Sequence, residues 1–139
     1  MNAKGAPRFR GFSAGSHPSG KPRPEALRQL ESAGIATEGL RSKSWDEFAV
    51  AGAPQIDFIF TVCDNAAHEV CPVWPGHPMT AHWGIADPAA VTGTPEEIAR
   101  AFAEAFTILR RRIELFLALP LATLDAMALQ QRLNQIGKS

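Results

Sequence analysis

The feature that most constrains the fold is the apolar run IDFIFTVCD at residues 56–64. A short, nearly continuous apolar run is typical of a parallel β-strand that is buried on both faces. Parallel strands need crossover connections, usually helices, and a chain of 139 residues is long enough for one such domain. The run therefore predicts an α/β fold around a parallel sheet.

Helical patterns flank this run on both sides. Residues 24–33 predict a helix with Pro24 in its first turn and Gly34 just after its end. A longer helix is predicted from Thr94, since Thr94 and Glu97 form a capping box around Pro95. Apolar residues then recur at helical spacing and predict its core face, namely Ile98, Phe102, Ala105, Leu109, Ile113 and Phe116.

Four weaker signals complete the expected order of elements. Residues 8–16 predict a short strand, and residues 79–83 predict a second one. A short helix is expected after Ser44, with Glu47 three residues on as its capping partner. A second amphipathic segment follows Pro120, which is expected to end the long helix.

Composition excludes several classes of protein. The chain has no apolar run of about 18 residues, so a transmembrane span is not expected. Its N-terminus has no apolar segment of the kind that a secretory signal contains, so a signal peptide is not expected either. Two cysteines are too few for a secreted disulfide framework, so we expect a cytoplasmic protein.

Charge is unevenly distributed. Residues 1–43 carry eight Lys and Arg against three Glu, whereas residues 44–139 carry six Lys and Arg against eleven Asp and Glu. The basic first third favours an oxyanion ligand, or it is an ordinary solvated surface. Nucleic-acid binding is not expected, because the basic residues are scattered and no aromatic residues alternate with them.

Cys63 and Cys71, the two cysteines of the chain, allow three interpretations. They could bind zinc with two of His68, His77 and His82, although their spacing matches no compact zinc knuckle, and we expect no metal site. They could be two inert core thiols. They could also be a redox pair, because the short loop between them can bring the sulfurs together and Cys63 ends a strand, where ligand sites of α/β sheets lie.

Asp87 is a second candidate. It precedes Pro88 in HWGIADPAAVTGTPEE, between a strand and the long helix, and could act as a general acid over a cleft. An Asp-Pro pair can also simply form a turn. His82 and Trp83 could line the same cleft or belong to the core.

Four segments in order resemble the arsenate reductases built on the low-molecular-weight tyrosine phosphatase fold: FSAGSHPSG, LRSKSWDEF, DFIFTVCDNAAHEVCPVWPG and AHWGIADPA. The resemblance covers about residues 8–120 and implies a three-layer α/β sandwich with a parallel sheet, with residues 121–139 as an amphipathic tail. The phosphatase branch usually has an aromatic pair after Asp-Pro, whereas this chain has Ala89 and Ala90 there and no tyrosine. The arsenate reductase branch is therefore favoured, with a tyrosine phosphatase as an alternative.

The resemblance also implies roles for individual residues. Asp87 takes the place of the general acid, Cys63 and Cys71 those of the second and third thiols of a redox relay, and Ser13 and Ser42 those of polar residues that support the oxyanion loop. Arsenate or another oxyanion is the implied substrate. No bound cofactor is implied, but an external thiol reductant such as thioredoxin or glutaredoxin is required.

The chain departs from the family pattern in one respect. The family begins with a strand, a Cys-x5-Arg loop and a helix, and no Cys-x5-Arg occurs here, since Glu69 and His77 stand where Cys63 and Cys71 would need Arg. We therefore expect a truncated chain without turnover, its sheet lacking the central first strand and self-associating through the open edge. The alternative is a non-catalytic module, a pseudoenzyme that binds a protein partner.

Overall fold

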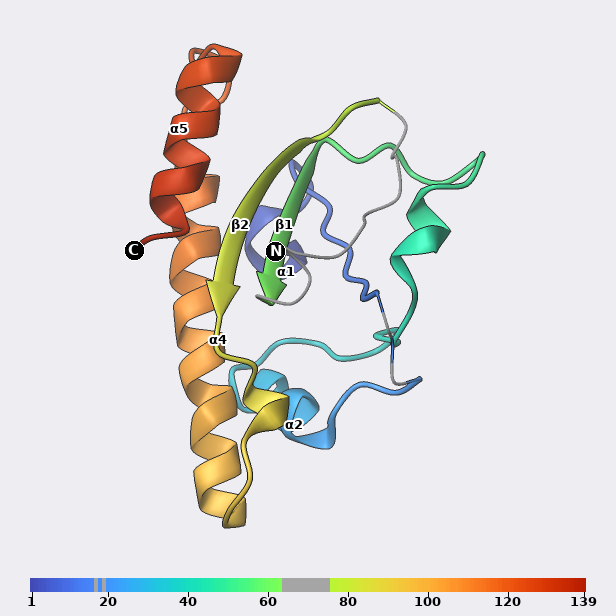
Figure 1. Ribbon diagram of the computed structural model, residues 1–139, viewed down its shortest axis with the longest axis vertical. Helices are drawn as coiled ribbons and strands as arrows, with labels where there is room; N and C mark the ends of the chain where they lie inside the picture. Colours follow the sequence, from blue (N-terminus) through green and yellow to red (C-terminus); the bar gives the residue numbers. More distant parts are fainter. Residues whose placement is uncertain (17, 19, 64–75) are drawn as a thin grey trace.

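Two parallel strands form the sheet of this computed structural model, which describes residues 1–16, 18, 20–63 and 76–139. The strands are β1 (Phe58–Cys63) and β2 (Met79–Ile85), and they pair directly. The other elements are α1 (Asn2–Gly5), α2 (Pro24–Ser32), η1 (Trp45–Phe48), η2 (Pro88–Ala90), α4 (Pro95–Leu117) and α5 (Ala126–Ile136). In Figure 1 both α4 and α5 lie on the β2 side of the sheet, with α5 above α4 and overlapping its upper end, where the two helices are in contact. The α/β fold with a parallel sheet is confirmed and is consistent with a phosphatase-like three-layer sandwich.

The long helix α4 forms where its sequence predicted it. The Thr94 side chain caps its first turn by accepting a hydrogen bond from the Glu97 main-chain N–H (3.2 Å), and Pro95 takes the first helical position. Phe102 and Phe116 are buried on its inner face, and the other residues of the predicted core face are at least half-buried. The helix ends at Leu117, a turn before Pro120.

The core lies on one face of the sheet. Alternate residues along the strands point toward α4 and α5, and at the centre the Phe60 ring stacks on Trp83 with ring centres 3.8 Å apart. Phe116 of α4 packs against Phe58 and Phe60 at about the same level of the sheet. Helix α5 closes this cluster with Leu129, Leu133 and Ile136, which are all buried.

The expectation that the strand at residues 56–64 is buried on both faces was wrong for the described residues. Every β1 residue whose burial is described is only half-buried or exposed, and Val62 exposes 39% of its surface. On β2 burial alternates, with Ala81 and Trp83 buried and Thr80 and His82 exposed. The apolar run signalled a strand correctly, but within the described residues helices cover only the face that carries Trp83.

The strand predicted at residues 8–16 does not form either. Only Gly15 makes a strand-like contact, an isolated bridge with Ser44. The two aromatic residues of this segment pack on different neighbours, Phe9 on Phe116 (5.2 Å between ring centres) and Phe12 on Phe48 (5.4 Å). The two ring contacts hold the segment in place, although it forms no strand ladder.

The outer edge of β2, away from β1, is covered by side chains of α4 and α5. Gln130 donates to the Thr80 carbonyl (2.8 Å), and Arg112 donates to the carbonyls of Trp83 (2.7 Å) and Gly84 (3.3 Å). In contrast, no described segment other than β2 makes a backbone hydrogen bond to β1. The described sheet therefore has one covered edge and one open edge.

Candidate active site at the carboxyl ends of the strands

The carboxyl ends of β1 and β2 bring two of the predicted residues to one end of the sheet. Cys63 is the last residue of β1 and lies opposite Ile85, the last residue of β2. The register shifts just before this pair, because Thr61 lies opposite His82, so that β2 carries an extra residue there. Such bulges often re-aim a chain near a functional site. Asp87 follows two residues after Ile85, so it leaves the sheet at the end where Cys63 lies.

Asp87 has the local structure of an Asp-Pro turn. Its Oδ1 accepts a hydrogen bond from the Ala89 main-chain N–H (2.9 Å), which caps the short helix η2. The side chain is exposed, and this is its one hydrogen bond to other described residues. The turn interpretation is thus what the geometry shows, and an exposed carboxyl group at this position is also accessible to a ligand.

The two predicted cleft residues, His82 and Trp83, lie on opposite faces of the sheet. Trp83 is 2% exposed and belongs to the core, where its indole N–H donates to the Leu133 carbonyl (3.0 Å). His82 is exposed on the opposite face, and its Nδ1 lies 2.7 Å from the Thr61 hydroxyl. Only His82 therefore remains a candidate for contact with solvent or a ligand.

Ser13 and Ser42 line one shallow pocket of about 160 Å³, together with Ala14, Gly15, Pro18, Arg41 and Lys43. The bridge between Gly15 and Ser44 holds the two segments together, since Gly15 N–H donates to the Lys43 carbonyl and Trp45 N–H donates to the Gly15 carbonyl, each at 3.0 Å. In Figure 1 the segment after α2 passes below the arrowheads of the strands on its way to this bridge. The structure thus brings the two predicted serines together.

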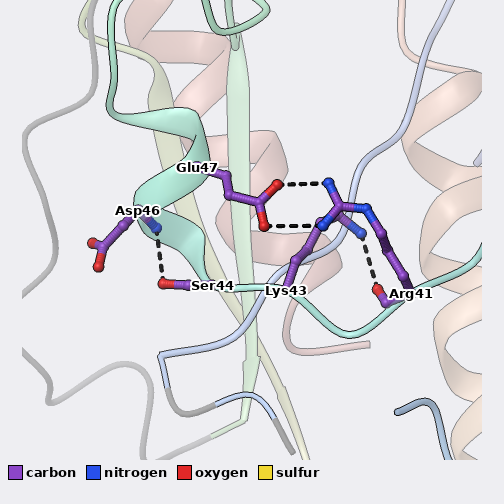
Figure 2. Close-up of polar contacts among 5 residues, drawn as sticks. All are labelled: Arg41, Lys43, Ser44, Asp46 and Glu47. Atoms are coloured by element: carbon purple, nitrogen blue, oxygen red, sulfur yellow. Dashed lines mark hydrogen bonds and ion pairs between the residues drawn. The ribbon is translucent and has the colours of Figure 1, made fainter. Parts of the chain in front are cut away.

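Arg41 and Lys43 were not singled out from the sequence, and Glu47 was predicted only as a capping residue of the short helix after Ser44. Figure 2 shows the Arg41 guanidinium forming two hydrogen bonds with the Glu47 carboxylate, at 3.0 and 2.6 Å. This pairing lowers the pKa of Glu47 below its ordinary value and raises that of Arg41. The predicted capping role of Glu47 was wrong: Ser44 caps η1 by accepting from the Asp46 N–H (3.2 Å), and Glu47 points to Arg41 instead.

The remaining predicted residue, Cys71, lies outside the described residues, as does His68 of the zinc interpretation. Within residues 1–16, 18, 20–63 and 76–139, no three His, Cys, Asp or Glu side chains come together in a way that could hold a metal ion. No described helix is long and apolar enough to cross a membrane.

The sequence profile of the low molecular weight phosphotyrosine protein phosphatases matches residues 1–130 of the chain. The chain belongs to this family. Its family members include proteins named arsenate reductase, and one from Halalkalibacterium halodurans is 32% identical over 105 residues, which are 76% of this chain and 72% of that protein. One from Bacillus licheniformis is 36% identical over 86 residues, or 62% of this chain and 58% of that protein.

Family membership covers the elements described above. The match to residues 1–130 includes both strands, Asp87, the pocket of Ser13 and Ser42, and helix α4. The chain nevertheless spans only 58% of the length of the Bacillus licheniformis relative and the same share of the Shouchella clausii arsenate reductase, to which it is 34% identical.

Proposed function

We propose that this phosphatase-family chain carries the thiol-relay and general-acid parts of an arsenate reductase, which converts arsenate to arsenite. The observation that carries the proposal is the pairing of Cys63 with Ile85, which sets a thiol-bearing residue and Asp87 at one end of the sheet. The relatives named arsenate reductase, at 32–36% identity, support this branch of the family over the phosphatase branch.

The proposed reaction passes through one thiol–arsenic intermediate and two disulfides. A thiolate of a Cys-x5-Arg loop, as the family resemblance implies, binds arsenic while Asp87 donates a proton to the oxygen that leaves as water. Cys63 then attacks that thiol's sulfur, and arsenic departs as arsenite with the two electrons of its bond. Cys71 resolves the first disulfide by forming one with Cys63. An external thiol reductant, such as thioredoxin or glutaredoxin, returns both to thiols.

The 139-residue polypeptide contains no Cys-x5-Arg, so we expect it to show no arsenate reduction or phosphatase turnover by itself. A general acid alone typically contributes about 10²–10⁴-fold, which cannot replace a missing nucleophile. The assay measures arsenite from arsenate with a thioredoxin system, and phosphate from phenyl phosphate. Turnover that disappears in a Cys63→Ser variant contradicts this expectation and makes Cys63 a primary nucleophile.

The relay itself is tested by oxidation. Mild oxidation followed by peptide mapping should give a disulfide between Cys63 and Cys71, because the relay requires their sulfurs to meet at about 2 Å. A Cys71→Ser variant is the matched control and should leave Cys63 free. Two thiols that stay free in the unaltered chain, or that pair only between molecules, contradict the relay.

The lack of a Cys-x5-Arg favours a second candidate, a non-catalytic module that keeps the family fold and binds a protein partner. The two candidates differ in the oxidation experiment, since a binding module needs no disulfide between Cys63 and Cys71. In either case we propose a cytoplasmic location, where thiols stay reduced, and self-association through the open edge of β1.

A further inference from the structure

The carboxyl end of β2 departs from a regular parallel ladder. Thr61 of β1 lies opposite His82 of β2. Two residues later on β1, Cys63 lies opposite Ile85, so that β2 carries one extra residue within positions 83–84. Such a bulge is rare in a parallel pair, and it leaves backbone groups without partners in the ladder. Buried backbone groups need a partner, so another part of the molecule has to supply one.

The guanidinium of Arg112 supplies it. Arg112 belongs to α4, which lies beside the carboxyl end of β2 (Figure 1), and only 7% of its surface is exposed. Its Nη1 donates to the carbonyl oxygens of both Trp83 (2.7 Å) and Gly84 (3.3 Å). In a regular strand the carbonyls of successive residues point toward opposite edges, so a donor at one edge does not normally reach both. The shared donor therefore marks the bulge and stabilises it.

The burial of Arg112 has a cost that packing alone does not explain. Its Nη2 donates to the Ser139 carbonyl oxygen (3.3 Å), whereas its Nε has no partner among the described residues. Removing a charged group from water lowers stability unless its hydrogen bonds compensate. An apolar side chain at this position would avoid that cost, but it would leave two carbonyls of β2 without their donor. The hydrogen bonds to the bulge thus distinguish Arg112 from a residue that only fills space.

The bulge decides which residues meet at the end of the sheet. In a regular ladder Gly84 would lie opposite Cys63, and Asp87 would follow that pair by three residues instead of two. One residue of a strand is about 3.3 Å long. A shift by one residue also turns the side chains of a strand to the other face of the sheet. Without the bulge, Asp87 would therefore leave the sheet displaced and in a different direction relative to Cys63.

We propose that Arg112 is a positioning residue of the candidate active site, because it holds the bulge that sets Ile85 opposite Cys63 and thereby fixes the place of Asp87. The inference rests on the proposed function, in which Cys63 and Asp87 act at one end of the sheet. Arg112 takes no part in the chemistry and acts only through two backbone carbonyls of β2.

The test measures the register of the two strands by NMR in the reduced, full 139-residue chain. In the unaltered chain, backbone NOEs should connect Cys63 with Ile85, and the guanidinium protons of Arg112 should show NOEs to Trp83 and Gly84. Arg112→Met keeps an unbranched side chain but has no donor. In this variant the NOEs between Cys63 and Ile85 should be lost, and NOEs between Cys63 and Gly84 should appear.

Two further variants separate positioning from general stability. Arg112→Lys places a single nitrogen donor near both carbonyls, as Nη1 is, and should keep the register of the unaltered chain. Gln130→Met removes a different donor to the same edge of β2, at the Thr80 carbonyl (2.8 Å), and should also keep it. The amide signals of Asp87 and Ala89 should shift only in Arg112→Met, because both residues come shortly after the bulge.

NOEs between Cys63 and Ile85 that persist in a folded Arg112→Met protein, or that are lost equally in Gln130→Met, overturn the proposal. Absence of guanidinium NOEs to Trp83 and Gly84 in the unaltered chain also overturns it, and this measurement does not require any variant to fold. If the unaltered chain lacks the NOEs between Cys63 and Ile85, the proposed site fails together with this inference. None of these measurements involves a thiol reaction, so failure of the disulfide in the oxidation experiment counts against the relay alone.

Discussion

At the scale of single residues, Arg112 is the buried charged side chain of the described core, with 7% of its surface exposed. Its guanidinium donates to the main-chain oxygens of Trp83, Gly84 and Ser139, while its Nε has no partner among the described residues. Burying a cation costs folding free energy unless its N–H groups are hydrogen-bonded. Here they join α4 to the irregular end of β2 and to the chain after α5.

We therefore expect Arg112→Ala to lower the free energy of unfolding by about 2–4 kcal/mol, because two strand carbonyls lose their donor inside the protein. Urea denaturation followed by tryptophan fluorescence measures this, since Trp83 lies at the site. The matched control is Arg111→Ala, an exposed neighbour whose loss should change stability by no more than about 0.5 kcal/mol. Equal effects of the two substitutions contradict the structural role of Arg112.

Gly137 allows α5 to end directly against β2. A Cβ at this position would lie 2.5 Å from the His82 carbonyl oxygen and 2.9 Å from the Trp83 ring. We expect Gly137→Ala to destabilise the fold by about 1–3 kcal/mol, because backbone must move to make room. Gly15→Ala is the control for a glycine with open space above it. Thermal unfolding measures the stability of both variants. If Gly137→Ala is as stable as Gly15→Ala, the close contact of Gly137 with β2 is ruled out.

At the scale of elements, success of the sequence predictions depended on whether an element carries its own signals. Helix α4 has a cap, a proline at its start and a continuous apolar face, so local sequence defines it. The bounds of β1 also followed from its apolar run. Residues 8–16 have no comparable local signal, and the contacts of Phe9 and Phe12 with distant rings decide their path. The pairing of Arg41 with Glu47 was missed because Glu47 also fits a capping pattern.

The cap of α4 gives a prediction at this scale. Thr94→Ala should lower the free energy of unfolding by about 1 kcal/mol, because the Glu97 N–H loses its acceptor. Thr92→Ala, two residues before the cap, should have almost no effect. Chemical denaturation compares the two. An equal loss in both variants means that the Thr94 hydroxyl does not stabilise the helix.

At the scale of the whole molecule, stability is unevenly distributed. The buried residues gather where α4 and α5 meet β2, whereas β1 is half-exposed and pairs on one edge. We expect amide hydrogens of α4 near Phe116 to exchange with solvent much more slowly than those of β1 that do not face β2, because only the former are shielded by the core. Native-state exchange measured by NMR gives both rates, and equal protection of the two elements contradicts this distribution.

The unequal edges of the described sheet limit how copies of this chain could join. Side chains of α4 and α5 cover the outer edge of β2, whereas among the described elements the outer edge of β1 has no backbone partner, so a strand from another molecule could add there. If two copies pair at β1, we expect a four-stranded sheet with two-fold symmetry and helices along both margins. We then expect sedimentation to show at most a doubling of mass, and larger species at high concentration contradict this. Such a pairing would also cover the edge of the apolar strand FIFTVC, a type of segment that can form fibrils when its edge stays exposed.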